Sequence, residues 1–161
     1  MNSPTSVSRS AASSIAQVSL FAALMAVLGL IPKIDLPMGV PITAQSLGVM
    51  LAGVMLGPRK GFQAMFLFLA AVAVGLPLLS GGRGGIGVFM APSAGYLLGY
   101  APAALIVGAI MYAMPQRSPR GIALSAFVAS LVGGLIALHA MGVAGLVMMA
   151  GLTLKQAFFA T

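Results

Sequence analysis

Long apolar runs alternate along the chain with short segments rich in glycine, proline and basic residues. The apolar runs cover residues 15–31, 44–56, 61–79, 93–114 and 121 to about 139. A helix that crosses the roughly 30 Å hydrocarbon core of a bilayer needs about 20 apolar residues. The pattern therefore predicts an all-α fold, a polytopic transmembrane helical bundle with five spans, preceded by a polar N-terminal tail over residues 1–14.

The segments between the runs carry residues that end helices. Residues 33–43 contain two prolines, residues 80–92 contain a cluster of glycines, and Gly57 and Pro58 follow the second run. Proline removes a backbone donor and clashes with the preceding helical turn. We therefore expect loops at 33–43 and 80–92, a break at Gly57–Pro58, and a short amphipathic segment at 151–161.

Composition places the chain among membrane proteins. Of its 161 residues, 60% are hydrophobic and 6% are charged, whereas about a quarter of the residues of soluble domains are charged. We expect one transmembrane domain over residues 1–161, located in the inner (plasma) membrane of the cell.

The titratable residues exclude most chemistry. The chain has one acidic residue, Asp35, one histidine, His139, and no cysteine. Paired carboxylates, a Cys/His zinc site and a Ser/His/Asp triad are therefore not expected. The chain also lacks the phosphate-binding motif Gly-x-x-x-x-Gly-Lys-Ser/Thr. We expect no enzymatic activity, no metal and no cofactor, and active transport would use ATP only in a partner ATPase.

The basic residues sort onto two sides of the predicted bundle. The net charge of +7 is scattered along the chain, which is unlike the clustered charge of a nucleic-acid-binding face. The excess of positive residues marks the cytoplasmic side of a membrane protein, so the N-terminus is predicted to be cytoplasmic. The cytoplasmic group is Arg9, Arg59, Lys60, Arg117 and Arg120, and the external group is Lys33, Arg83 and Lys155.

Arg83 is the strongest candidate for a ligand contact. It lies within Gly81–Gly85, and flanking glycines leave its guanidinium unobstructed. It could bind a ligand carboxylate through charge-assisted hydrogen bonds, or extend to lipid phosphate as an interfacial anchor. The Gly-x-Gly-x-x-Gly spacing at 82–87 does not indicate a dinucleotide site, because no acidic residue follows it.

Several other polar or small residues allow two structural interpretations. Gln45 begins the second run and could face a ligand or hydrogen-bond another helix. Asp35 could pair with Lys33 or contribute to a ligand site, and His139 is read as a packed or interfacial residue. Ala22 and Ala26 are spaced for close approach of a second helix or recur by chance in an alanine-rich segment.

A set of motifs in the central part of the chain has a fixed order and spacing. The motifs are VPITAQSLGVMLAG (40–53), LGPR (56–59), GLP (75–77), SGGRGGIG (80–87), PSAGYLLGY (92–100) and the later GLTLKQA (151–157). This set resembles the BioY family, the biotin-specific substrate-binding (S) components of energy-coupling-factor (ECF) transporters.

The resemblance implies six helices that hold biotin near the external face, beneath the loops. It implies partners as well: an ECF transmembrane coupling protein, contacted through Ala22 and Ala26, and two ABC-type ATPases. One departure from the family pattern is that the sequence stops at Thr161, before the family's Gly-Asp-x-x-Lys segment and sixth helix. The final helix is therefore expected to be missing from the sequence given.

The predicted function is high-affinity biotin capture and uptake, with no cofactor. Arg83 is assigned to the carboxylate or to loop closure, Gln45 and Tyr96 to polar contacts, and the glycines to close backbone approach. The alternatives are a small membrane scaffold or assembly protein with no solute ligand, and an autonomous carrier. The expected ligand-binding residues are Gln45, Gly81, Gly82, Arg83, Gly84, Gly85, Ser93 and Tyr96.

Overall fold

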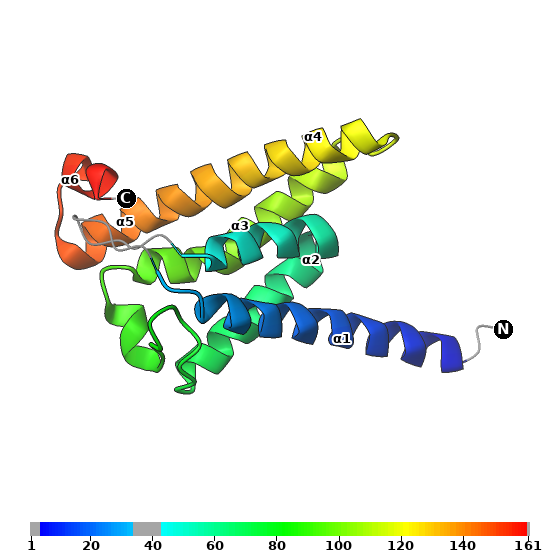
Figure 1. Cartoon of the computed structure of the whole chain (residues 1–161), viewed down its shortest axis with the longest axis horizontal. Coiled ribbons are helices and arrows are strands. Elements are labelled where there is room, and N and C mark those ends of the chain that lie inside the picture. The colour runs from blue at the N-terminus through cyan, green and yellow to red at the C-terminus, as the bar shows by residue number, and fades with distance from the viewer. Residues whose placement is uncertain (1–3, 34–42, 161) are drawn as a thin grey trace.

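The computed structural model describes residues 4–33 and 43–160. Helices account for most of these residues (Figure 1), which confirms the all-α prediction. In chain order the elements are α1 (Pro4–Gly29), α2 (Gln45–Ala73), the 3-10 turn η1 (Ile86–Met90), α3 (Ala94–Ala113), α4 (Pro119–Ala129), the π-helical segment η2 (Ser130–Ala137), α5 (Leu138–Ala150) and α6 (Leu154–Phe159).

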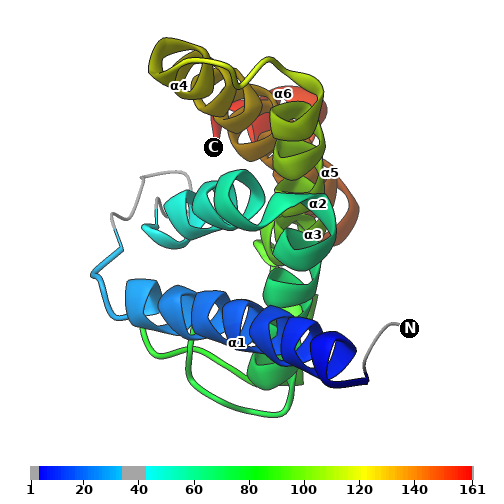
Figure 2. The same cartoon turned by 90° about the vertical axis from the view of Figure 1, so that its right-hand side faces the viewer.

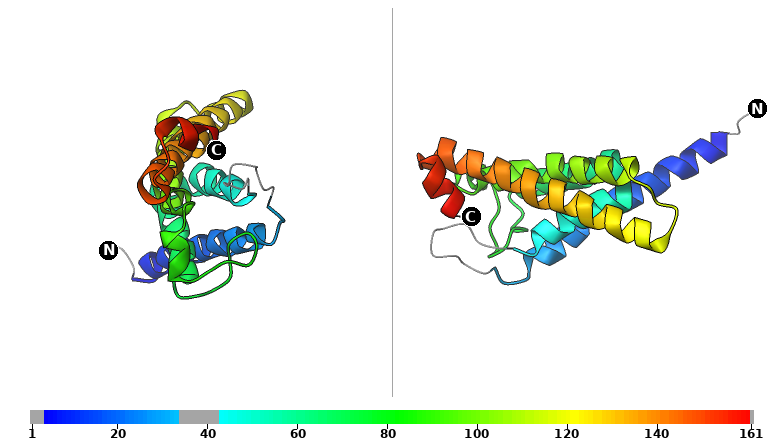
Figure 3. Two further views of the ribbon diagram at one scale, coloured as in Figure 1. Left: turned by 90° about the vertical axis from the view of Figure 1, so that its left-hand side faces the viewer. Right: turned by 90° about the horizontal axis from the view of Figure 1, so that it is seen from above.

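The helices are arranged in layers. Helix α1 packs on α2, and α3 packs on α2 and on the continuous α4–η2–α5 helix. Figures 2 and 3 show α1 and α4–α5 on opposite sides of α2 and α3. The main core therefore lies around α2 and α3, and its largest fully buried side chains include Met25, Val49, Met65, Phe68 and Val72.

The predicted break at Gly57–Pro58 divides α2 into two limbs. Gly57 has φ 78° and ψ −178°, a conformation outside the helix that glycine adopts without strain. Gly108 of α3 packs so closely on Gly57 and Pro58 that a Cβ there would meet their backbone. The second limb ends at Ala73 and not at Leu79 as predicted, because the chain turns at Gly75, which has φ 109°.

The last long helix extends further than the sequence suggested. Helices α4, η2 and α5 form one apolar stretch of 32 residues, Pro119–Ala150. The predicted end near His139 is therefore wrong, since the helix continues to Gly151, whose left-handed φ of 65° ends it. After it, α6 is the short segment expected there, and a capping box between Thr153 and Gln156 starts it.

The first helix also begins earlier than predicted. It starts at Pro4 and not at Ile15, so most of the expected polar tail is helical. Proline is favoured in the first turn of a helix because its missing N–H has no partner there in any case. Three stretches are long and apolar enough to cross a membrane among the described residues, namely Ala11–Gly29, Ala94–Ala113 and Pro119–Ala150.

The ends of the helices gather at two opposite ends of the molecule. In Figure 1 the start of α1, the kink of α2 and the α3–α4 turn lie at one end of the long axis. Residues 74–93 and α6 lie at the other end. This separation agrees with the predicted sorting of loops, while the cytoplasmic location of the first end stays a prediction.

Candidate functional site

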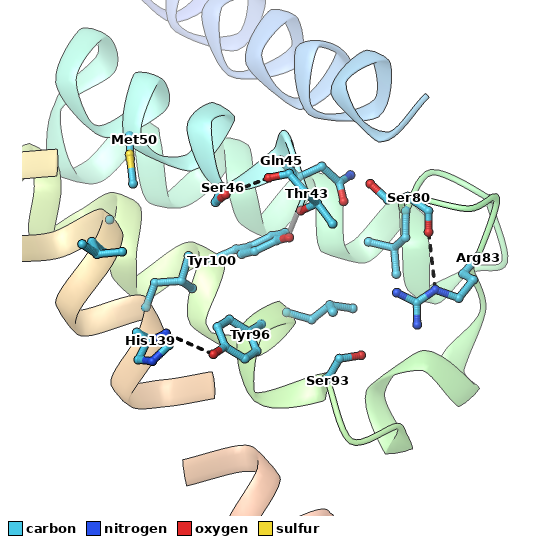
Figure 4. Close-up of a pocket in the computed structure, with 15 residues that line it drawn as sticks. Thr43, Gln45, Ser46, Met50, Ser80, Arg83, Ser93, Tyr96, Tyr100 and His139 are labelled. Carbon is cyan, nitrogen blue, oxygen red and sulfur yellow. Dashed lines mark hydrogen bonds between the residues drawn. The ribbon is translucent and has the colours of Figure 1, made fainter. Parts of the chain in front are cut away.

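A cavity of about 310 Å³ opens between the first limb of α2, the turn at 79–83, the first half of α3 and the η2–α5 junction. Figure 4 shows the lining side chains converging on it from these elements. Ligand pockets in proteins start at about this size. The lining residues are Thr43, Gln45, Ser46, Met50, Leu79, Ser80, Arg83, Ser93, Tyr96, Leu97, Tyr100, Gly134, Leu135, Leu138 and His139.

Arg83 forms the cationic end of this cavity. The backbone N–H of Leu79 donates to the Arg83 carbonyl at 3.0 Å, which closes the tight turn that carries the side chain. Among the described residues, the half-buried Arg83 side chain makes one long hydrogen bond, 3.5 Å from Nε to the Ser80 carbonyl oxygen. No carboxylate lies among the described residues, so within them nothing competes with an anionic ligand for Arg83.

Gln45 both lines the cavity and ties neighbouring elements together. Its side chain is 1% exposed, and Nε2 donates to the carbonyl of Met25 in α1 at 3.2 Å. The same Nε2 donates to the carbonyl of Leu78 at 3.0 Å. The interhelical reading of Gln45 is therefore confirmed, and its amide nitrogen is engaged by protein.

Tyr96 and His139 lie together on another part of the wall. The Tyr96 hydroxyl is 3.3 Å from His139 Nδ1, and the His139 ring also meets Phe158 of α6 edge-on. The Tyr96 ring covers Gly142 so closely that a Cβ there would overlap it. Sequence reasoning missed His139 as a site residue, although a lone histidine within an apolar helix was the available signal.

The hydroxyl residues complete the polar lining. Ser93 lies at the N-cap of α3, but its side chain makes no capping hydrogen bond and borders the cavity. The hydroxyl groups of Tyr100 and Thr43 belong to residues that also line the cavity. Ser80 is 1% exposed and was also missed, because nothing in its sequence context distinguishes it from an ordinary loop serine.

The glycines expected at the ligand do not line this cavity. Gly81 and Gly82, with φ 82° and 68°, border a separate depression near Lys33 and Pro77. Their positive φ values indicate that they are needed for the course of the loop.

The two following glycines fit the loop against α2. A Cβ on Gly84 would overlap the Leu76 carbonyl, so the chain passes there only without a side chain. Gly85, with φ 83°, donates its N–H to the carbonyl of Val72 at 2.8 Å near the end of α2. In this structure the four glycines shape the turn that presents Arg83.

The remaining candidates lie elsewhere. Ala22 and Ala26 are half-buried on α1 and pack against the main core, while Ala23 between them is exposed. Asp35 and its suggested pairing with Lys33 lie outside the described residues.

The cavity combines three kinds of surface. One part of the lining is cationic, and other parts carry hydroxyl, amide and imidazole groups. The apolar walls are formed by Leu79, Leu97, Leu135 and Leu138. Such a lining suits a small molecule that has one carboxylate, a neutral hydrogen-bonding group and an apolar body.

Comparison with known proteins agrees with this arrangement. The chain is 49% identical over 142 residues to the biotin transporter BioY of Rhodobacter capsulatus, covering 87% of this chain and 73% of that protein. It is 46% identical over 143 residues to the biotin transporter BioY of Rhizobium etli, covering 87% and 76%.

The fold is similar to a 2.1 Å crystal structure of the S-component for biotin from an ECF-type ABC transporter. The TM-score is 0.81 at 26% identity, over 94% of this chain and 80% of that one. The model of the BioY family matches residues 2–161. The resemblance seen in the central motifs is thus confirmed, and the chain belongs to the BioY family.

Proposed function

We propose that this chain captures biotin with high affinity and serves in its uptake as the substrate-binding component of an ECF-type ABC transporter. The observation that carries the proposal is the cavity bordered by Arg83 in a fold shared with a biotin S-component. A transport role also agrees with the transporter names of the relatives.

The chemistry of biotin matches the lining of the cavity. Its carboxylate would bind the Arg83 guanidinium, for which the described residues provide no competing anion. Its ureido group would find neutral polar partners among Gln45, Ser93, Tyr96 and His139. The leucine walls would contact the thioether ring and alkyl chain.

Energy for uptake would come from partner proteins. We propose an ECF transmembrane coupling protein with two ABC-type ATPases, because this chain has no phosphate-binding loop of its own. The exposed side of α1, next to Ala22 and Ala26, is the candidate contact for the coupling protein. The proposed location is the inner membrane, with the N-terminus cytoplasmic and the cavity near the outer face.

The test is equilibrium binding of radiolabelled biotin to the detergent-purified chain. Saturable binding that unlabelled biotin displaces, and that thiamine does not, is the expected result. Any native form that extends beyond Thr161 should be measured beside it, to determine whether additional residues contribute contacts. Absence of saturable binding in both folded forms would contradict the proposal and favour a scaffold, which should co-purify with partners irrespective of biotin.

A further inference from the structure

Ser80 is a buried polar residue whose hydroxyl is without a hydrogen-bond partner in the part of the chain that the structure describes. Its side chain is 1% exposed, and its Oγ has no hydrogen-bond partner among the described residues. Leaving a buried hydroxyl unpaired costs about 1–3 kcal/mol. Such a group is retained at a stability cost, which is typical of a functional site.

The unpaired hydroxyl borders the cavity on the turn that carries Arg83. Ser80 lines the cavity, and its carbonyl accepts the 3.5 Å hydrogen bond from Arg83 Nε. The backbone bridge between Leu79 and Arg83 closes this turn, which keeps the backbone of Ser80 close to that of Arg83. Figure 4 shows both residues on the same side of the cavity.

Other hydroxyls of the lining differ from Ser80 in this respect. Ser46 Oγ donates to the Thr43 carbonyl at 2.8 Å, and the Tyr96 hydroxyl lies 3.3 Å from His139 Nδ1. Ser80 is therefore a fully buried donor that no described residue of the protein uses. A carboxylate accepts several hydrogen bonds, and in a site of low dielectric it needs them.

We propose that Ser80 Oγ donates a hydrogen bond to the ligand carboxylate beside Arg83, which makes Ser80 a specificity-determining residue for the free acid. This inference rests on the proposed function, since it assigns the acid end of the biotin site. It distinguishes the role of Ser80 from that of Gln45, whose amide nitrogen is already bonded to Met25 and Leu78.

The test compares Ser80→Ala with Ser125→Ala on the full chain, using biotin and its neutral carboxamide as probes. Ser125 is the matched control, because it is also 1% exposed, lies away from the cavity in α4, and has a satisfied hydroxyl that donates to the Pro115 carbonyl at 3.1 Å. Dissociation constants and ligand-free thermal unfolding are measured for each protein.

Ser80→Ala is expected to weaken biotin binding by about tenfold or more, the effect of losing a hydrogen bond to a charged group. Binding of the carboxamide should change by less than about twofold, and the ligand-free Tm should stay level or rise. Ser125→Ala should lower the ligand-free Tm and leave both affinities unchanged.

An equal loss for biotin and carboxamide would place Ser80 at the neutral end of the ligand and overturn the inference alone. Unchanged biotin affinity in a folded Ser80→Ala protein would do the same. If the unmodified chain binds no biotin, the proposed function fails and the inference falls with it.

Discussion

The hydroxyl of Tyr96 in α3 lies 3.3 Å from Nδ1 of His139 in α5, 43 residues away in sequence. Both side chains border the cavity, so the contact joins two helices at the wall that would hold the ligand. Gly142 of α5 lies against the Tyr96 ring, and its lack of a side chain leaves room for that ring.

Tyr96→Phe keeps the ring but removes its hydroxyl. A neutral hydrogen bond contributes about 1 kcal/mol, so biotin binding is expected to weaken by about fivefold. Combining it with His139→Ala should give less than the sum of the two single effects, because the residues contact each other. Tyr112→Phe, at a position 74% exposed and outside the cavity, is the control. Additive effects would show that the pair does not act together.

Gly142→Ala should displace the Tyr96 ring, because the new methyl group would occupy the space of that ring. We expect biotin affinity to fall by more than tenfold, along with a lower Tm, since overpacking costs about 1–3 kcal/mol. Gly121→Ala in α4 is the control, because its Cβ would come no closer than 3.2 Å to its neighbours. Normal affinity in a folded Gly142→Ala protein would contradict the placement of Tyr96.

Arg83→Ala is expected to weaken biotin binding at least tenfold without lowering expression, because a hydrogen bond to a charged group contributes about 1.5–3 kcal/mol. Arg83→Lys should recover only part of this loss, since lysine keeps the charge but not the planar fork. Arg117→Ala changes an exposed cation at the other end of the molecule and serves as control. Unchanged affinity of the alanine variant would identify Arg83 as a lipid anchor.

Gln45→Leu preserves the approximate volume but removes the donor that holds α1 and the Leu78 segment to α2. Leaving a buried carbonyl without its donor is expected to cost about 1–3 kcal/mol and to lower the Tm in detergent. Gln17→Leu should change stability by no more than about 0.5 kcal/mol, because Gln17 is exposed and its one hydrogen bond among the described residues is a surface bond that it accepts from Lys60. Equal Tm values for Gln45→Leu and Gln17→Leu would argue against a stabilising role of the Gln45 hydrogen bonds.

The orientation can be tested on single-cysteine variants, because the chain contains no cysteine. Ile86→Cys lies near the cavity end, and Ser118→Cys lies in the exposed α3–α4 turn at the other end. In right-side-out membrane vesicles, an impermeant maleimide should label Ile86→Cys at once and Ser118→Cys only after permeabilisation. The reverse pattern would show that the N-terminus is external.

The sequence predicted those parts of the fold that depend on local chemistry. The span at 93–114 agrees with α3 within a residue at each end, and the break at Gly57–Pro58 is present. Both follow from proline and glycine, which act on the backbone directly. The position of Arg83 at the cavity could be anticipated for the same reason, since glycines mark the loop that carries it.

The features that were missed depend on contacts between distant residues. The helix continues past His139 because Gly133 and Gly142 fit against Val107 and Tyr96 on α3, and such glycines resemble helix ends when read along the sequence alone. Ser80 and His139 reach the cavity through the turn geometry and the helix register, which no local pattern specifies.

The π-helical segment η2 has a consequence for how the sequence can vary. Buried residues of the 119–150 helix recur mostly at every fourth position, a spacing that advances by about 40° per step in a regular α-helix. The wider turns of η2 absorb part of this advance and keep one face toward α2 and α3. These buried residues are Ser125, Ala129, Gly133, Gly134, Leu138, Gly142 and Leu146.

Deleting one residue from η2 would turn α5 by about 100° and carry His139 away from the cavity. The pocket therefore depends on the number of residues in this helix as well as on their identity. Exchanges between apolar residues there should be tolerated far better than any change of length.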